Sequence, residues 1–219
     1  MTGDRLVLII AAGLLYSSSF LVKGDGGLLD PWKQSLNLEH RGEFVKAAAV
    51  IEPLLNQGEY REYALLRYAW LAYQQRNYND SIRYYGQALK LNPASIDARF
   101  GLTLPLLAQS DWKKAKTYLH QITAVSPSNY TAHIRLFSCE EGLRQWKQLA
   151  THAEAFSRLY PTDIATLVYL ARAKHNLDDK VAAEAVYQQI QIRMPGHVEA
   201  LNYIRTFQNI QRIYSLQNP

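Results

Sequence analysis

Small and hydrophobic side chains recur every three or four residues over most of the chain, which is the spacing that places them on one face of an α-helix. Residues 62–95 show this pattern most clearly, as two series separated by a short polar stretch at 76–79. The first series is Leu65, Tyr68, Ala69 and Ala72, and the second is Ser81, Ile82, Tyr85, Ala88 and Leu89. The pattern therefore predicts two packed helices joined by a tight turn.

Residues 62–95 belong to a longer repeat, whose period of about 34 residues is typical of stacked repeat proteins. Four prolines follow this period, namely Pro93, Pro127, Pro161 and Pro195, and so does an aromatic column, namely Phe44, Tyr78, Trp112 and Trp146. Because proline cannot continue a helix, each proline is expected to mark where the second helix of a pair ends. A single helix pair leaves an apolar face exposed, so neighbouring pairs must stack to be stable.

Residues 62–95 resemble the tetratricopeptide-repeat (TPR) family. The signature positions of that family are occupied here by Leu65, Tyr68, Ala69, Ser81, Tyr85, Ala88 and Pro93. The same register gives copies at 28–61 (degenerate, with Glu59 in place of the proline), 62–95, 96–129, 130–163 and 164–197, followed by a capping helix at 198–219. The resemblance implies an all-α, right-handed α-solenoid of about five helix pairs with a C-terminal capping helix. An apolar run before the first copy predicts an N-terminal hydrophobic helix that precedes the solenoid.

Two prolines fall inside predicted helices. Pro105 lies in the first helix of the copy at 96–129, and Pro53 lies in the second helix of the copy at 28–61. Each proline removes a backbone hydrogen bond, so we expect both helices to kink. Local curvature of the solenoid is the favoured interpretation of Pro105, and a widened groove is the alternative.

Leu6 to Val22 is an uncharged run, followed by a Gly-rich linker at 24–27. Its length matches the lower limit, about 17 residues, for a helix that crosses the hydrocarbon core of a bilayer. We interpret residues 1–23 as an anchor that holds the repeats at a membrane, on the exported, periplasmic side. One alternative is a cleaved signal peptide, because Ser17 and Ser19 are small enough for a signal peptidase, which would leave the repeats periplasmic or secreted. The other is a helix buried against the first repeat or a partner.

The composition favours a folded chain without a nucleic-acid partner. Hydrophobic residues make up 48% of the chain, which is enough for a continuous core. The 24 Lys and Arg outnumber the 19 Asp and Glu, but they are scattered. Nucleic-acid binding requires a concentrated basic face, so the lysines at 113–116 are interpreted as a solvated helix face. Cys139 is the single cysteine, which excludes an intrachain disulfide and is typical of a small core residue.

Motifs for catalysis, metals and cofactors are absent from the sequence. It contains no Gly-rich phosphate loop, no Gly-x-Ser-x-Gly elbow and no His-Glu-x-x-His. None of the six histidines has a partner at the helical spacing that would share a metal ion, and each is interpreted as a surface or groove residue. Glu140 and Glu141 point in different directions on a helix, so they do not form an acid–base pair. We predict a non-enzymatic protein with no metal and no cofactor.

The resemblance implies a binding groove on the concave wall of the solenoid, lined by the first helix of each pair. The predicted partner-binding residues are Trp32, Tyr63, Leu66, Trp70, Tyr73, Phe100, Leu104, Arg172 and His175. We expect this groove to change from apolar near the N-terminus to polar and basic near the C-terminus. The clamp with which some TPR proteins hold acidic chaperone tails is absent, because Leu66, Trp70 and Leu104 occupy positions where that clamp uses Lys and Asn. Trp70 points away from the buried face of its helix, so truncating it is expected to abolish partner capture without changing stability.

Three functions remain open at this point. The leading hypothesis is a membrane-tethered scaffold or adaptor that binds partner proteins and assists the assembly or stability of an envelope multiprotein complex. The second is a soluble exported adaptor or chaperone, released by signal cleavage. The third is an accessory protein of polysaccharide synthesis or export, in which groove aromatics stack on sugar rings.

Overall fold

The computed structural model describes residues 29–56 and 58–217, so the predicted anchor run at 6–22 and the linker at 24–27 lie outside the described residues. The described ranges form eleven α-helices and one 3₁₀ helix and contain no strand, which confirms the predicted all-α class. The helices are α2 (Leu29–His40), α3 (Phe44–Ile51), η1 (Glu52–Leu54), α4 (Arg61–Gln74), α5 (Tyr78–Leu91), α6 (Ile96–Ala108), α7 (Trp112–Val125), α8 (Tyr130–Gly142), α9 (Trp146–Leu159), α10 (Ile164–Asn176), α11 (Lys180–Arg193) and α12 (Val198–Gln217). Within these ranges, no helix is both long enough and apolar enough to span a bilayer.

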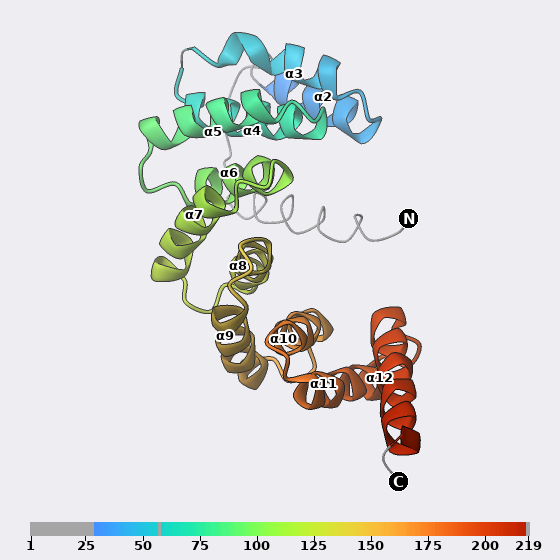
Figure 1. Cartoon of the computed structure of the whole chain (residues 1–219). Helices are drawn as coiled ribbons and strands as arrows, with labels where there is room; N and C mark the ends of the chain where they lie inside the picture. The colour runs from blue at the N-terminus through green and yellow to red at the C-terminus, as the bar shows by residue number, and fades with distance from the viewer. Residues whose placement is uncertain (1–28, 57, 218–219) are drawn as a thin grey trace.

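Consecutive helices pack in pairs, and each pair packs against the next, so that the stack curves into an arc (Figure 1). Helices α6, α8 and α10 follow the inner side of this arc, whereas α7, α9 and α11 follow the outer side. Helix α12 packs against α11 at the C-terminal end. This arrangement brings the side chains of successive first helices together on one concave wall, which we call the inner face.

The proline and aromatic columns mark the two ends of each second helix. The four prolines stand two residues after the last residues of α5, α7, α9 and α11, as expected for a residue that cannot continue a helix. The four aromatic residues are the first residues of α3, α5, α7 and α9. The first helices α6, α8 and α10 begin at side-chain caps, since Ser95, Asn129 and Asp163 each accept a hydrogen bond from the N–H group three residues later.

The turn within each helix pair contains one residue in the left-handed region of backbone space. These residues also recur with the period of the repeat, and they are Gly42, Arg76, Ser110, Arg144 and Asp178, with φ between 54° and 76°. The next N–H in each turn bonds back to the carbonyl five residues earlier, as from Asp111 to Leu106 at 2.8 Å. This bonding pattern defines a Schellman helix terminus, where glycine is the usual residue. Four of the five positions therefore carry a side chain in a conformation that costs roughly 1–2 kcal/mol.

The predicted kink at Pro53 is wrong, because the α-helix ends before this residue. Helix α3 stops at Ile51, and the chain continues as the 3₁₀ helix Glu52–Leu54. A proline is tolerated near the start of a new helical turn, where its missing N–H has no partner to lose. Pro105, in contrast, lies buried inside α6, which continues to Ala108.

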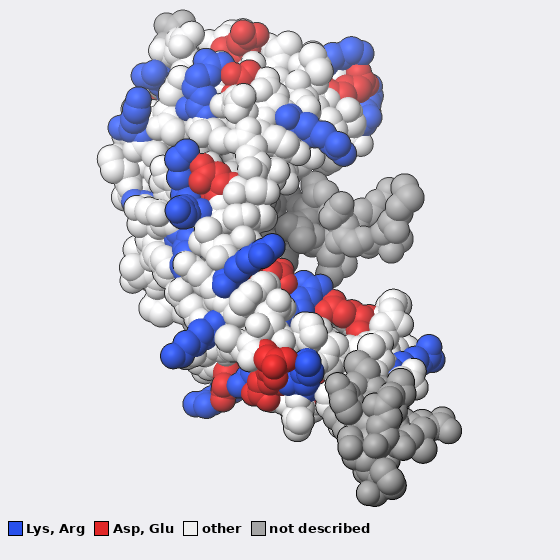
Figure 2. Space-filling view, viewed as in Figure 1, with Lys and Arg blue, Asp and Glu red and all other residues white. Residues whose placement is uncertain are grey.

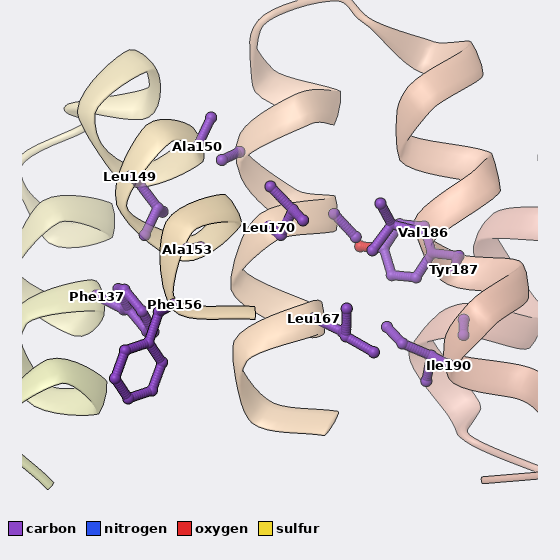
Figure 3. Packing of buried hydrophobic residues seen from close by; sticks show 13 residues of the cluster. Phe137, Leu149, Ala150, Ala153, Phe156, Leu167, Leu170, Val186, Tyr187 and Ile190 are labelled. Carbon is purple, nitrogen blue, oxygen red and sulfur yellow. The ribbon is translucent and has the colours of Figure 1, made fainter. Parts of the chain in front are cut away.

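The core runs along the arc as three clusters of buried side chains, each drawn from neighbouring helix pairs. Figure 3 shows the C-terminal cluster, in which residues of α9 face Leu167 and Leu170 of α10, and these in turn face Val186 and Ile190 of α11. Full burial of each such aliphatic side chain contributes roughly 1.5–3 kcal/mol. No single helix pair of the described chain has a core of its own, so the pairs stabilise one another.

Candidate protein-binding face

The N-terminal half of the inner face carries the aromatic side chains that the sequence predicts for the groove. The rings of Trp32 on α2 and Tyr63 on α4 lie 4.8 Å apart between their centres. Trp70 stacks on Tyr73 with the ring centres 5.8 Å apart, and Tyr73 also lies 5.8 Å from Tyr78. The first two helix pairs thus carry two aromatic pairs, and all four side chains are partly exposed. Such rigid, amphipathic rings are typical anchors of protein interfaces.

Trp70 also forms a hydrogen bond to a neighbouring helix, which the sequence does not indicate. Its indole Nε1 donates a hydrogen bond to Oε1 of Glu39 at 2.7 Å, and Glu39 forms an ion pair with Arg67. Arg67 in turn donates to Oγ of the buried Ser35 at 3.2 Å. These four residues join α2 to α4, so we expect truncation of Trp70 to lower stability, contrary to the expectation from the sequence.

Three further residues predicted for the groove are partly buried against the core and partly exposed on the inner face. Leu66 packs against two of the core clusters, and Phe100 packs against the middle cluster. Leu104 is half-buried on α6. Each of them keeps a part of its surface exposed, so they form an apolar floor between the aromatic pairs and the middle of the arc.

Arg135 on α8 lies beside this apolar floor, although the sequence prediction omitted it. Its guanidinium group stands 5.2 Å above the ring of Phe100, and Nη1 donates hydrogen bonds to the Phe100 carbonyl at 2.9 Å and to Oγ1 of Thr103 at 2.7 Å. Burial lowers the pKa of Arg135 to about 10. Electrostatic interactions with Tyr73, Tyr85 and Cys139 oppose this shift. Burial also raises the pKa of Cys139 to about 12, so the thiol is neutral near pH 7.

At the C-terminal end, the predicted basic character of the groove is wrong for Arg172, because carboxylates neutralise it. Arg172 donates to Glu199 of α12 from Nε at 2.8 Å and from Nη2 at 2.7 Å, and its Nη1 lies 3.3 Å from Glu141. The nearby Nδ1 of His175 lies 3.3 Å from the hydroxyl of Tyr203. Both predicted residues thus hold α12 in place.

A cleft of about 930 Å³ lies beside these contacts, between α11 and α12. Its lining includes His175, which the sequence predicts as a groove residue. It also includes residues that were not predicted there, such as Lys180, Tyr187, His197, Tyr203 and Phe207. The acid that neutralises Arg172 and the ring that contacts His175 both come from α12, a helix outside the repeat copies, so the repeat register gave no signal for either.

Two histidines that the sequence treats as separate surface residues meet between α8 and α9. Nδ1 of His133 lies 2.8 Å from Nε2 of His152, and Nδ1 of His152 lies 3.1 Å from a carboxylate oxygen of the buried Glu140. Nζ of Lys116 stands 3.9 Å from the same carboxylate group. The histidines belong to different helices, so no local spacing indicates the contact. Within the described ranges, no three His, Cys, Asp or Glu side chains are placed to hold a metal ion.

Charges of both signs are interspersed over the face of the molecule shown in Figure 2, with wide uncharged areas between them. Many of the charged side chains form ion pairs within one helix turn, such as Arg83 with Asp80 and Lys114 with Asp111. Exposed pairs of this kind contribute little to stability. The partly buried aromatic and charged groups of the inner face are therefore better candidates for specific contacts with a partner than these exposed ion pairs.

Comparison with known proteins supports the family resemblance. Residues 62–95 match the family described as Tetratricopeptide repeat. No curated protein matches the chain. The matched copy is the one in which the two helical faces are clearest in the sequence.

Several solved structures resemble most of the solenoid. MamA, from residue 41 to its end, from Desulfovibrio magneticus RS-1, has a TM-score of 0.72 at 18% identity, over 80% of this chain and 98% of that chain. A tetratricopeptide repeat protein from Parabacteroides merdae ATCC 43184 has a TM-score of 0.74 at 10% identity, over 85% of this chain and 78% of that chain. YrrB, described as a TPR protein with an unusual peptide-binding site, has a TM-score of 0.67 at 15% identity, over 77% and 87% of the two chains. At these identities the likeness shows the fold, a solenoid of TPR helix pairs.

Proposed function

We propose that this protein is a non-enzymatic scaffold that holds a segment of a partner protein against its inner face, along the aromatic pairs of α2 and α4 and the apolar floor formed by Leu66, Phe100 and Leu104. The partly exposed pair of Trp32 and Tyr63 is the observation that carries this proposal. Two large rings at this position lose little conformational entropy on binding and offer a wide apolar contact. The fold class itself supports a role in protein–protein interaction, since stacked helix pairs build extended concave binding surfaces.

The inner face is suited to a segment rather than to a small molecule. The aromatic pairs, the floor and Arg135 belong to α2, α4, α6 and α8, so they follow the arc over four successive first helices. An extended or helical peptide contacts such a series through side chains at regular intervals. The peptide-binding site named for YrrB is a site of that protein, and it supports the same class of ligand here.

The uncharged run at 6–22 supports a further part of the proposal, namely that the scaffold is tethered to a membrane with its repeats on the exported side. The tether would place the apolar half of the inner face close to the bilayer, where it would serve the assembly or stability of an envelope complex. Fractionation of cells that express the full chain tests this part. Recovery in the membrane fraction with Met1 intact supports the anchor, whereas a mature N-terminus downstream of Ser19 supports the cleaved alternative.

Binding is tested by pull-down from solubilised membranes with mass spectrometry. Trp32→Ala should reduce capture of the native partner at least about tenfold, as expected for the loss of an aromatic anchor. Val45→Ala is the matched control, because Val45 lies on α3 of the same helix pair and is 68% exposed. Equal capture by wild type and Trp32→Ala would show that the partner binds elsewhere on the solenoid.

A further inference from the structure

The inner face contains the same side-chain arrangement twice, separated by two repeats. In the first arrangement, Arg67 donates to Oγ of Ser35 and pairs with the carboxylate of Glu39. Advancing along the sequence by twice the repeat period takes Ser35 to Thr103 and Arg67 to Arg135. Arg135 donates to Oγ1 of Thr103 at 2.7 Å, so the contact between guanidinium and hydroxyl is preserved.

The two hydroxyls are alike in their burial and in donating a proton, although Ser35 donates to the paired helix α3 and Thr103 donates within its own helix α6. Ser35 and Thr103 are both fully buried, and each donates its own proton to a backbone carbonyl, that of Ala47 at 3.0 Å and that of Phe100 at 2.8 Å. Each hydroxyl oxygen is thereby oriented to accept from the arginine. The aromatic position is also kept, because Trp32 corresponds to Phe100. The two arrangements therefore share a fully buried hydroxyl that accepts a hydrogen bond from the arginine at the equivalent position.

The carboxylate is what the second arrangement lacks. Glu39 corresponds to Leu107, a half-buried aliphatic residue on α6. In the part of the chain that the structure describes, Arg135 has no ion pair, and the groups that act on it are a thiol and two tyrosines. Burial lowers the pKa of its guanidinium, as expected for a cation whose desolvation is not offset by a neighbouring carboxylate. Among the described residues, its hydrogen bonds all come from Nη1, so Nε and Nη2 are available for a carboxylate.

We infer that Arg135 receives an aspartate or glutamate side chain from the partner segment, which takes the place that Glu39 holds beside Arg67. This inference rests on the proposed function, and it specifies the chemistry of the partner: an acidic side chain flanked by apolar residues. The flanking preference follows from the surroundings of Arg135, which are Phe100 beneath the guanidinium, Tyr73 beside it and the half-buried Leu104 on α6. The site differs from the clamp for acidic chaperone tails, because it uses one arginine and apolar neighbours.

Leu107→Glu tests the equivalence of the two arrangements without altering Arg135. If the place of the carboxylate is vacant, Leu107→Glu supplies the acid within the chain, and its melting temperature should exceed that of Leu107→Gln, which has the same shape and no charge. Equal melting temperatures would overturn the equivalence, because an acid at position 107 would then not reach Arg135. This comparison needs no partner.

Binding of short fluorescein-labelled peptides, followed by anisotropy, tests the ligand. One set contains Leu, Phe and Ala with a single Glu at each position in turn, and a second set has Gln instead. A third set has neither residue but carries a free C-terminal carboxylate. Wild-type protein should prefer Glu to Gln at one position by about tenfold or more, and Leu107→Glu should lose this preference while Leu107→Gln keeps it.

The inference fails if wild type binds the Glu and Gln sets equally, if Leu107→Glu keeps the preference, or if the third set binds as tightly as the first. It also fails if no peptide binds to the wild type. The proposed function is judged separately by the capture of the native partner with Trp32→Ala, so a scaffold that binds a partner without an acidic anchor would be recognised as such.

Discussion

The ring of Tyr85 on α5 fills the space in which Gly101 on α6 has no side chain. A Cβ atom added at Gly101 would overlap Cε1 and Cζ of that ring and would stand 2.7 Å from its Cδ1. Tyr85 is buried in the middle core cluster, which spans the second and third helix pairs and extends to α8 of the fourth. A tyrosine from one pair is therefore inserted against the backbone of the next, and this contact sets how closely the two pairs can stack.

Gly101→Ala should lower the free energy of unfolding by about 1–3 kcal/mol, because the added methyl group forces the ring or the helix to move. Gly86→Ala is the control. Gly86 also lies in a helix, α5, but an added Cβ there would have no atom within 4 Å. This substitution should stabilise the protein by about 0.5–1 kcal/mol through helix propensity alone. Urea unfolding followed by circular dichroism measures both, and a Gly101→Ala variant as stable as wild type would contradict the stacking role of Tyr85.

The sequence predicted the architecture because the repeat multiplies weak local signals. A single proline says little, but four prolines in register mark the ends of α5, α7, α9 and α11. The sequence did not predict the left-handed turn residues, since Arg76, Ser110 and Arg144 are residue types that seldom adopt a positive φ. Gly42 and Asp178 are the members of that column whose residue types favour this conformation.

The sequence indicates which side chains lie on the binding face, but it does not indicate which residues they form hydrogen bonds and ion pairs with. Helical periodicity indicates that Trp70 points away from the core, yet the acid that bonds it, Glu39, comes from a different helix earlier in the chain. Arg172 was predicted to supply positive charge, and its neutralisation by Glu199 depends on how α12 folds back. Contacts of this kind arise from packing between repeats, which a pattern within one helix cannot encode.

The turn residues give a prediction about backbone strain. Ser110→Gly should stabilise the protein by about 0.5–1 kcal/mol, because glycine adopts a φ of 59° without steric cost. Ala108→Gly, two residues earlier and at the exposed end of α6, should destabilise it by a similar amount, because there the backbone is helical. Thermal unfolding of the two variants compares them directly. If both glycines change stability in the same direction, the positive φ at Ser110 is not a source of strain.

Trp70 gives a prediction that separates packing from hydrogen bonding. Trp70→Phe keeps an aromatic ring but removes the indole N–H that donates to Glu39, so we expect a loss of about 1 kcal/mol. Trp70→Ala removes the stacking on Tyr73 as well and should cost about 2 kcal/mol or more. Denaturant midpoints provide the measurement. Were Trp70→Ala as stable as wild type, the link between α2 and α4 through Glu39 would contribute nothing to folding.

The contact between α12 and the last repeat gives a prediction about pH. The hydrogen bonds from Arg172 lower the pKa of Glu199 below its usual value of 4.5; partial burial opposes this shift, and a hydrogen bond from Tyr187 adds to it. A carboxyl group whose pKa is lower in the folded state contributes stability that is fully present above the unfolded value and is lost as pH falls through the folded value. The stabilisation by Glu199 is therefore complete above about pH 4.5 and disappears below it.

Glu199→Gln should accordingly melt at a lower temperature than wild type near neutral pH, and the difference should shrink as the pH falls below about 4.5 and Glu199 itself becomes protonated. Glu184→Gln is a suitable control, because Glu184 lies on the neighbouring α11 and accepts a hydrogen bond from Gln188 of the same helix. Its melting curve should follow that of wild type over the same pH range. A difference between Glu199→Gln and wild type that persists unchanged into acid would mean that the carboxylate charge does not hold α12, and that the hydrogen bond from Tyr187 and the apolar contacts of Tyr203 with Tyr187 do so instead.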